Sequence, residues 1–290
     1  MNTTLLVLVQ QMVASSTHVV ARSIAIAVPA TTIVLYRGLF SILAYAGWFA
    51  FRRHRSPMRP IEANDWWRFA VLGLLNMPIN QFLFVAGLQH TTPPNAALAF
   101  ALSPVFVLVF AWALLGEQLT RAKLAGVALA VTGAAVVAVG RGASVHSATT
   151  LGNLMEFAAS CAWSLYTVWG RPLVQRYGAV QTTAVGMLMG LGLFVPVALV
   201  VPDGIVHPWT LTARQWFEIA YLGIVTSGIG WALWYVLLRR MEAGRLAVFN
   251  NLQPVLTVAL AWLAFGELPA VEFWIGGTIA IAGVIITQRA

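Results

Sequence analysis

Polar side chains recur at helical spacing inside segments that are otherwise apolar. Gln11, Ser15, His18 and Arg22 follow one another at steps of four, three and four residues, which places them on one face of a helix. Amide, hydroxyl and imidazole groups on such a face can hydrogen-bond a polar solute, and His18 is a candidate proton carrier. Because polar groups are costly in an apolar medium, this face predicts a solvated cavity.

Similar faces recur along the whole chain. The candidate cavity residues are Gln11, Ser15, His18, Asn76, Asn80, Phe84, Ser103, Ser160, Trp163, Thr167, Ser227, Trp231, Tyr235, Asn250 and Gln253. Aromatic rings can pack against an apolar side chain while amides meet a carboxylate and an ammonium group, so the set suits an amino acid. The alternative for Trp163 and Trp231 is helix packing, and for His18 a structural hydrogen bond.

Two charged residues, Arg37 and Glu156, also fall inside apolar segments, at similar expected depth. A buried charge needs a partner, so the two form a candidate ion pair. Glu156 is in addition the candidate for proton coupling.

Sequence motifs for other chemistry are missing. There is no G-x-x-x-x-G-K-[ST] loop and no H-E-x-x-H, and the five histidines and the single cysteine, Cys161, are dispersed. We therefore expect no metal, no cofactor and no enzymatic activity. Two alternatives stay open: a channel-like facilitator, and an intramembrane enzyme acting on a lipid, with Glu156 and His18 as its candidate pair.

The elements that position these residues must lie in lipid. Hydrophobic residues make up 60% of the chain and charged residues 9%, with a mean hydropathy of +0.81, whereas a soluble protein carries roughly 25% charged residues. Segments of about 20 apolar residues predict membrane-spanning helices. The expected spans are 3–21, 30–50, 68–88, 95–115, 123–140, 151–170, 180–201, 216–238, 246–265 and 271–288. The fold class is an all-α membrane protein with the lipid bilayer as its partner.

The basic residues predict the orientation of these spans. With the N-terminus in the cytosol, thirteen lie at cytosolic span ends and three, Arg22, Arg141 and Arg214, at outer ends. This positive-inside bias places both termini in the cytosol. The net charge of +8 is scattered along the chain rather than gathered in a patch, so we expect no nucleic-acid partner.

One stretch of the chain occurs a second time in similar form. LSPVFVLVFAWALLGE begins at Leu102 and LQPVLTVALAWLAFGE at Leu252, and residues 63–133 align without gaps on 213–283 with nineteen identities. Residues 1–141 and 151–290 therefore form two repeats of five helices. Because five is odd, the second repeat must be inverted, which is the layout of a transporter with a site near the bilayer midplane.

Each copy carries a proline and a Gly-Glu pair. Pro104 and Pro254 should kink or break spans four and nine, and their symmetric placement predicts two hinges, with static kinks as the alternative. A carboxylate is favourable at a helix N-terminus, so Glu117 is expected to cap span five and Glu267 span ten.

The two copies resemble a known family. GLQHTTPPNAALAFALSPVFVLVFAWALLGEQLTRAKLAGVALAVTGAAVV and RRMEAGRLAVFNNLQPVLTVALAWLAFGELPAVEFWIGGTIAIAGVIITQ are similar to the EamA domain of the drug/metabolite transporter superfamily. The resemblance implies ten helices in two inverted halves and export of small metabolites without ATP. Within the superfamily the aromatic-amino-acid exporter branch is the nearest, which makes aromatic and other neutral amino acids the expected substrates. Transport of another metabolite, a drug or a sugar nucleotide is the alternative.

The arginine-over-lysine bias and the spans together favour the inner (plasma) membrane of a bacterium, crossed many times. We expect a monomer whose partner is a small-molecule substrate.

Overall fold

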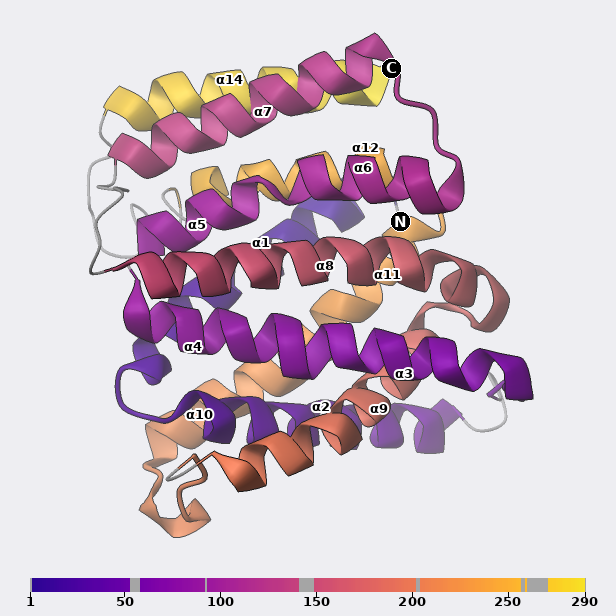
Figure 1. The fold of residues 1–290 in the computed structure, drawn as a ribbon, viewed down its shortest axis with the longest axis vertical. Coiled ribbons are helices and arrows are strands. Elements are labelled where there is room, and N and C mark those ends of the chain that lie inside the picture. The colour runs from indigo at the N-terminus through magenta and orange to yellow at the C-terminus, as the bar shows by residue number, and fades with distance from the viewer. Residues whose placement is uncertain are drawn as a thin grey trace.

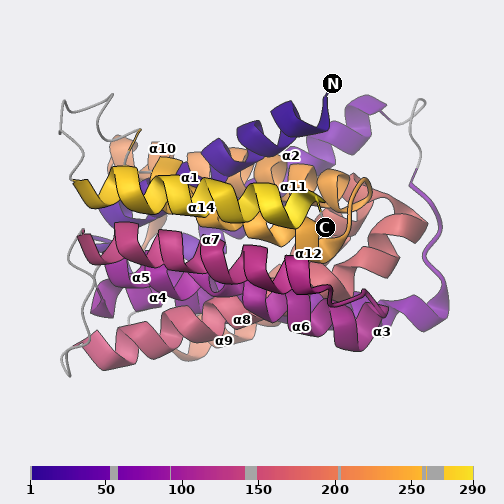
Figure 2. The same cartoon turned by 90° about the horizontal axis from the view of Figure 1, so that it is seen from above.

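The computed structural model describes residues 2–52, 58–91, 93–140, 149–201, 204–256, 259 and 271–289, and every regular element in those ranges is helical. The helices run roughly side by side in an elongated bundle (Figures 1 and 2). In chain order they are α1 (Thr3–Ala25), α2 (Ala30–Arg52), η1 (Ala63–Asp65), α3 (Trp66–Leu74), η2 (Leu75–Gln81), α4 (Phe82–His90), α5 (Pro93–Ala101), α6 (Ser103–Leu115), α7 (Arg121–Gly140), α8 (Thr150–Tyr177), α9 (Ala179–Val200), η4 (Pro208–Thr210), α10 (Ala213–Tyr221), η5 (Leu222–Gly230), α11 (Trp231–Leu238), α12 (Ala243–Ala247), η6 (Val248–Leu252) and α14 (Val271–Arg289).

Among the residues that the structure describes, eight helical runs are long and apolar enough to cross a membrane. They are Thr3–Ala25, Ala30–Phe51, Ala63–His90, Asn95–Leu115, Arg121–Gly140, Ala179–Val200, Ala213–Leu238 and Val271–Arg289. The all-helical prediction is thus confirmed for the described residues. The expected span 151–170 lies within the 28-residue α8, and the start of span 246–265 lies on α12 and η6.

The outer surface is apolar and the interior carries the polar groups. Phe51, Val200 and Phe217 are 85%, 80% and 71% exposed, whereas Arg37 is 2% exposed and Glu156 is fully buried. A protein surrounded by water rarely exposes so much apolar surface, whereas a surface that contacts lipid is expected to be apolar. The chain is a multi-pass membrane protein whose polar residues face one another.

Two of the long runs change from α- to π-helix in the middle. The segment η2 contains Pro78, and the segment η5 begins beside Gly223 and ends at Gly230. Shifted by 150 residues, η2 overlaps η5, so the helical runs Ala63–His90 and Ala213–Leu238 change helix type at corresponding positions of the two similar sequences. A π-helical stretch widens the turn, re-aims the side chains around it and is frequent at functional sites.

Helices α7 and α14 are in backbone contact along one edge of the bundle (Figures 1 and 2). Gly126 lies against the carbonyl oxygen of Gly283, and Gly133 lies against the carbonyl oxygen of Gly276. The two helices therefore run antiparallel, and small residues on both let the backbones approach closely.

Candidate functional site

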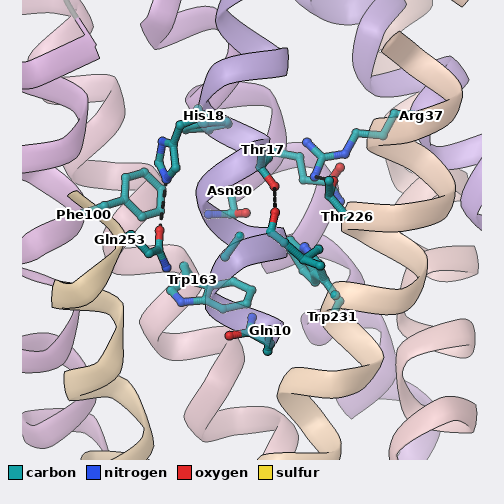
Figure 3. Close-up of a pocket in the computed structure, with 15 residues that line it drawn as sticks. Gln10, Thr17, His18, Arg37, Asn80, Phe100, Trp163, Thr226, Trp231 and Gln253 are labelled. Atoms are coloured by element: carbon teal, nitrogen blue, oxygen red, sulfur yellow. Dashed lines mark hydrogen bonds between the residues drawn. The ribbon is translucent and has the colours of Figure 1, made fainter. Parts of the chain in front are cut away.

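A cavity of about 80 Å³ lies among helices from the N-terminal and C-terminal halves of the chain. A cavity needs roughly 10–15 Å³ on this measure to hold one water, so the space admits several waters or part of a small solute. Figure 3 draws its fifteen lining residues and labels ten of them. The lining comprises Gln10, Val13, Ala14, Thr17, His18, Arg37, Asn80, Gln81, Phe84, Phe100, Trp163, Thr226, Gly230, Trp231 and Gln253.

The cavity brings together some of the residues expected from the sequence and leaves others elsewhere. Six candidate cavity residues line it, and Arg37 joins them; the six are His18, Asn80, Phe84, Trp163, Trp231 and Gln253. Helices α1, α2, α4, α5, α8 and α11, both π-helical segments and the helical residues 253–256 supply the lining.

His18 projects from α1 into an aromatic and amide setting (Figure 3). Its Nε2 lies 3.1 Å from the amide oxygen of Gln253, so this nitrogen is the donor. Phe84 and Phe100 meet the imidazole edge-on, with ring centroids 5.1 and 5.7 Å away. These contacts hold the imidazole ring in one orientation at the edge of the cavity.

Two tryptophans, Trp163 and Trp231, line the cavity, with the amide side chain of Gln10 below Trp163 in Figure 3. Trp163 of α8 and Trp231 of α11 make a T-shaped contact with ring centroids 4.8 Å apart. Behind them, Tyr166 stacks on Tyr235 at 5.0 Å. The two tryptophans therefore line the cavity and also pack α8 against α11. Cavity lining and helix packing, the two alternatives for these residues, thus both apply.

Arg37 reaches the cavity from α2. Its Nε donates to Ser227 Oγ at 2.5 Å, and its Nη2 donates to Thr226 Oγ1 at 3.2 Å. Both hydroxyls belong to η5, so the π-helical segment positions the guanidinium. Nearby, Ser41 Oγ donates to the carbonyl oxygen of Gly223, which fastens α2 to η5 a second time.

The expected ion pair between Arg37 and Glu156 is wrong. Within the described residues Arg37 has only hydroxyl partners, and neither carboxylate oxygen of Glu156 has a hydrogen-bond partner. Glu156 instead lies against Gly87 of α4. Similar depth along two helices does not make two residues face each other, because rotation about each helix axis decides which neighbour a side chain meets.

His18 and Glu156 do not form the acid–base pair that an intramembrane enzyme would need. His18 bonds Gln253, whereas Glu156 has no hydrogen-bond partner in the described part of the chain. In the same ranges, no three His, Cys, Asp or Glu side chains lie close enough to hold a metal ion.

A second polar cluster lies beside the cavity, between α1, α6 and η6. Gln11 Nε2 donates to Asn250 Oδ1 at 3.3 Å, and Asn250 Nδ2 donates to Ser103 Oγ at 3.1 Å. Ser15 Oγ bonds the Gln11 carbonyl oxygen at 2.8 Å, and Gln253 Nε2 bonds Asn250 Oδ1 at 3.2 Å. These candidate residues act as helix-to-helix links, and only Gln253 also reaches the cavity.

The remaining candidates are buried between helices. Asn76 Nδ2 contacts the Met187 sulfur at 3.3 Å, Thr167 accepts a hydrogen bond from Trp234 Nε1 at 3.0 Å, and Tyr235 donates to the Tyr166 carbonyl oxygen at 3.1 Å. The Ser160 hydroxyl is buried without a partner among the described residues.

Sequence reasoning missed several lining residues, including Gln10, Thr17, Gln81 and Thr226. Each is directly adjacent in sequence to a polar residue that was predicted to line the cavity: Gln11, His18, Asn80 and Ser227. Helical spacing identified the polar side of each helix. Adjacent residues on that side can face either the cavity or a neighbouring helix, and the packing of the neighbouring helices decides which of the two each residue faces.

The helix is interrupted before Pro104, whereas the chain around Pro254 only changes helix type. Helix α5 ends at Ala101, Leu102 forms a turn, and Pro104 occupies the first turn of α6, where its missing N–H costs no hydrogen bond. Pro254 follows a change of helix type, because η6 ends at Leu252 before the helical residues 253–256. The two places contact each other through the Asn250–Ser103 hydrogen bond.

The expected role of Glu117 as the cap of the next helix is wrong. Its carboxylate accepts hydrogen bonds from the backbone N–H groups of Ala243 (2.8 Å) and Gly244 (3.2 Å), and pairs with Arg171. It therefore caps α12, which is distant in sequence, while Thr120 Oγ1 accepts from the Lys123 N–H at the start of α7. Glu267, the expected cap of span ten, lies outside the described residues.

A second ion pair lies near Glu117. Lys123 Nζ is 2.7 Å from Glu242 Oε2, at the connection between α11 and α12. The hydrogen bond from Lys123 lowers the pKa of the Glu242 carboxyl group, and the charges of Lys123, Arg245 and Arg171 act in the same direction. Charged contacts thus hold α7, α8 and α12 together at one end of the bundle.

Comparison with known proteins gives a family, relatives and a fold. The EamA-like transporter family matches residues 1–139 and, separately, residues 150–289. A protein from Streptantibioticus cattleyicolor, named a probable terminal-alkyne amino-acid exporter, is 33% identical over 80% of this chain and 76% of its own length. An uncharacterized transporter from Archaeoglobus fulgidus is 28% identical over 88% of this chain and 86% of its own length.

Two further likenesses are more distant. A WAT1-related protein from Arabidopsis thaliana is 26% identical over 93% of this chain and 76% of its own length. A solved crystal structure superposes with a TM-score of 0.78 and 21% identity, covering 98% of this chain and 96% of that chain, which shows a shared fold.

Proposed function

This chain belongs to the EamA-like transporter family, and from that premise we propose that it is a secondary transporter that exports small organic metabolites, with amino acids as the preferred class. The observation that carries the proposal is the cavity, which combines Trp163, Trp231 and Phe84 with amides and a buried arginine. Such a lining suits a solute with an apolar side chain and charged groups at one end. The amino-acid exporter among the relatives points the same way.

The proposed architecture is ten spans in two inverted halves, residues 1–141 and 151–290, with both termini in the cytosol. It is supported by the two separate family matches, by the matching π-helical segments and by the antiparallel α7 and α14. The positive-inside bias supports the orientation. We place the protein, as a monomer, in the bacterial inner membrane, where it would export by rocking one half against the other.

The test of this function is a substrate panel in proteoliposomes that contain the purified protein. Aromatic and aliphatic amino acids, a cationic drug and a sugar nucleotide would be assayed by counterflow, at two pH values and with and without a membrane potential. Saturable counterflow of amino acids is the expected result. If only the drug or the sugar nucleotide is transported, the proposal that amino acids are the substrates is wrong. If the flux does not saturate, the protein is a channel and not a carrier.

The helix interruption before Pro104 and the change of helix type before Pro254 are proposed hinges. Pro104→Ala and Pro254→Ala are expected to lower the counterflow rate at least about tenfold while leaving membrane insertion and yield unchanged, because alanine allows a continuous, stiffer helix. Pro196→Ala, at a proline inside α9 away from the cavity lining, is the matched control. Rates equal to wild type in both hinge variants would leave both places as static features.

Glu156 is the proposed carrier of a coupled proton. Its two carboxylate oxygens are buried and have no hydrogen-bond partner among the described residues, so a proton would remove an uncompensated charge. In Glu156→Gln, which mimics the protonated form, counterflow is expected to continue while uphill transport driven by a pH gradient is lost. The measurement is transport with and without that gradient, and an unchanged response to it contradicts this role.

A further inference from the structure

We propose that Arg37 binds the carboxylate group of the transported solute, so that the site accepts α-amino acids and other carboxylates and rejects simple amines. The inference rests on the proposed function and names the residue that selects the substrate class. Its starting point is a cation that lines the cavity and is only 2% exposed.

The first step concerns charge. A buried guanidinium requires a counter-charge, because neutral partners do not repay the loss of its hydration. Within the described residues, Arg37 makes no ion pair, and its hydrogen-bond partners are the hydroxyls of Ser227 and Thr226. No Asp or Glu is among the described residues that line the cavity. An anion from outside the protein is therefore the natural counter-charge.

The second step concerns geometry. A guanidinium has five N–H donors in a planar fork that matches a carboxylate. The bonds to Ser227 and Thr226 use one N–H on Nε and one on Nη2, which leaves three donors without a partner among the described residues. Figure 3 shows the side chain extending from α2 toward Thr226 and Thr17 at the cavity. The two hydroxyls aim the fork, and the remaining donors are available to a solute.

The third step concerns the rest of an amino acid. Gln81 is 1% exposed, lines the same cavity, and its Oε1 has no hydrogen-bond partner among the described residues. A buried acceptor of this kind can receive a hydrogen bond from the ammonium group. The rings of Phe84, Trp163 and Trp231 then remain for the side chain. The positive charge of a cationic amine would be repelled by the Arg37 guanidinium, and the amine would not supply the counter-charge that Arg37 needs.

The test compares four related compounds on the wild-type protein in proteoliposomes: L-phenylalanine, 3-phenylpropionate, L-phenylalanine amide and phenethylamine. Competition with L-phenylalanine counterflow measures the apparent affinity of each. We expect the two carboxylates to compete about 10- to 100-fold better than the two amines, which is the range for one charge-assisted hydrogen-bonding pair. Equal competition by all four compounds would overturn the proposal without any variant being made.

The variant series separates recognition from a structural role. Arg37→Gln is expected to lower the affinity for L-phenylalanine about 10- to 100-fold and to bring the carboxylate-to-amine ratio close to one, with Arg37→Lys intermediate. If Arg37 only fastens α2 to η5, all four compounds would weaken together and the ratio would stay at its wild-type value. Arg214→Gln, at an 80% exposed side chain, is the matched control.

The two proposals fail in different ways. If the wild-type protein moves none of the amino acids in the panel but moves another solute, the amino-acid assignment fails, and the same carboxylate-to-amine comparison on analogues of that solute still tests Arg37. If amino acids are moved but amines compete equally well, the transport function stands and the role of Arg37 is wrong.

Discussion

Replacing Glu117 with alanine is expected to lower the free energy of unfolding by about 3–5 kcal/mol, the range for removing one partner of a buried ion pair. The Glu117 side chain is 6% exposed and that of Arg171 is 19% exposed. Alanine would leave the arginine unpaired and the N–H groups of Ala243 and Gly244 without their acceptor. The measurement is denaturant unfolding of the purified protein in mixed micelles.

The matched control for this prediction is an exposed ion pair on the same protein. Glu62 and Arg176 lie 2.7 Å apart with side chains 58% and 48% exposed, so Glu62→Ala should cost less than about 1 kcal/mol. If Glu117→Ala does not fold, Glu117→Gln keeps the volume and one acceptor and should give an intermediate loss. Equal stability of Glu117→Ala and Glu62→Ala would show that the cap and the ion pair contribute little.

Placing valine at Gly133 is expected to cost about 3 kcal/mol or more and to separate α7 from α14. A Cβ at this position would lie 2.5 Å from the Gly276 carbonyl oxygen and would also meet the Ala280 backbone. Backbone atoms cannot turn away as a side chain can, so the helices themselves would have to move. The measurement is the unfolding free energy together with the yield of folded protein.

Gly192→Val supplies the control for the α7–α14 contact. Gly192 is also in a helix, but a Cβ there meets nothing within 4 Å, so valine should be close to neutral. A spectroscopic distance between labels on α7 and α14 would show whether Gly133→Val opens this edge. Unchanged stability and an unchanged distance would contradict the close backbone packing.

The helical runs Ala63–His90 and Ala213–Leu238 show how far sequence reasoning reaches. Apolar length predicted helices over 68–88 and 216–238, and the structure has helical runs over Ala63–His90 and Ala213–Leu238. The π-helical segments η2 and η5 inside them were not predicted. Hydropathy reports how much of a segment prefers lipid, but the widening of one turn depends on neighbours such as α2, whose Ser41 bonds a carbonyl oxygen of η5.

The two wrong predictions have one physical cause. Glu117 was assigned to the next helix in the chain and Arg37 to a carboxylate at similar depth, but Glu117 caps α12 and Arg37 bonds η5. Both assignments used position along the chain or along the membrane normal. Neither quantity contains the rotation of a helix about its axis, which decides which residues meet.

The sequence by itself determined the helical runs of the described residues, the apolar outer surface, the similarity between residues 63–133 and 213–283, the interruption before Pro104 and the membership in a transporter family. These follow from residue types and their spacing, because lipid requires long apolar helices and proline disfavours the continuation of a helix, although Pro172 and Pro196 lie inside the continuous helices α8 and α9. Tertiary structure alone decided that Gln10 and Gln81 line the cavity while Gln11 and Asn76 bond between helices. The reason is that helices with several polar positions have several ways to face one another, and the choice is made by the packing of all their neighbours at once.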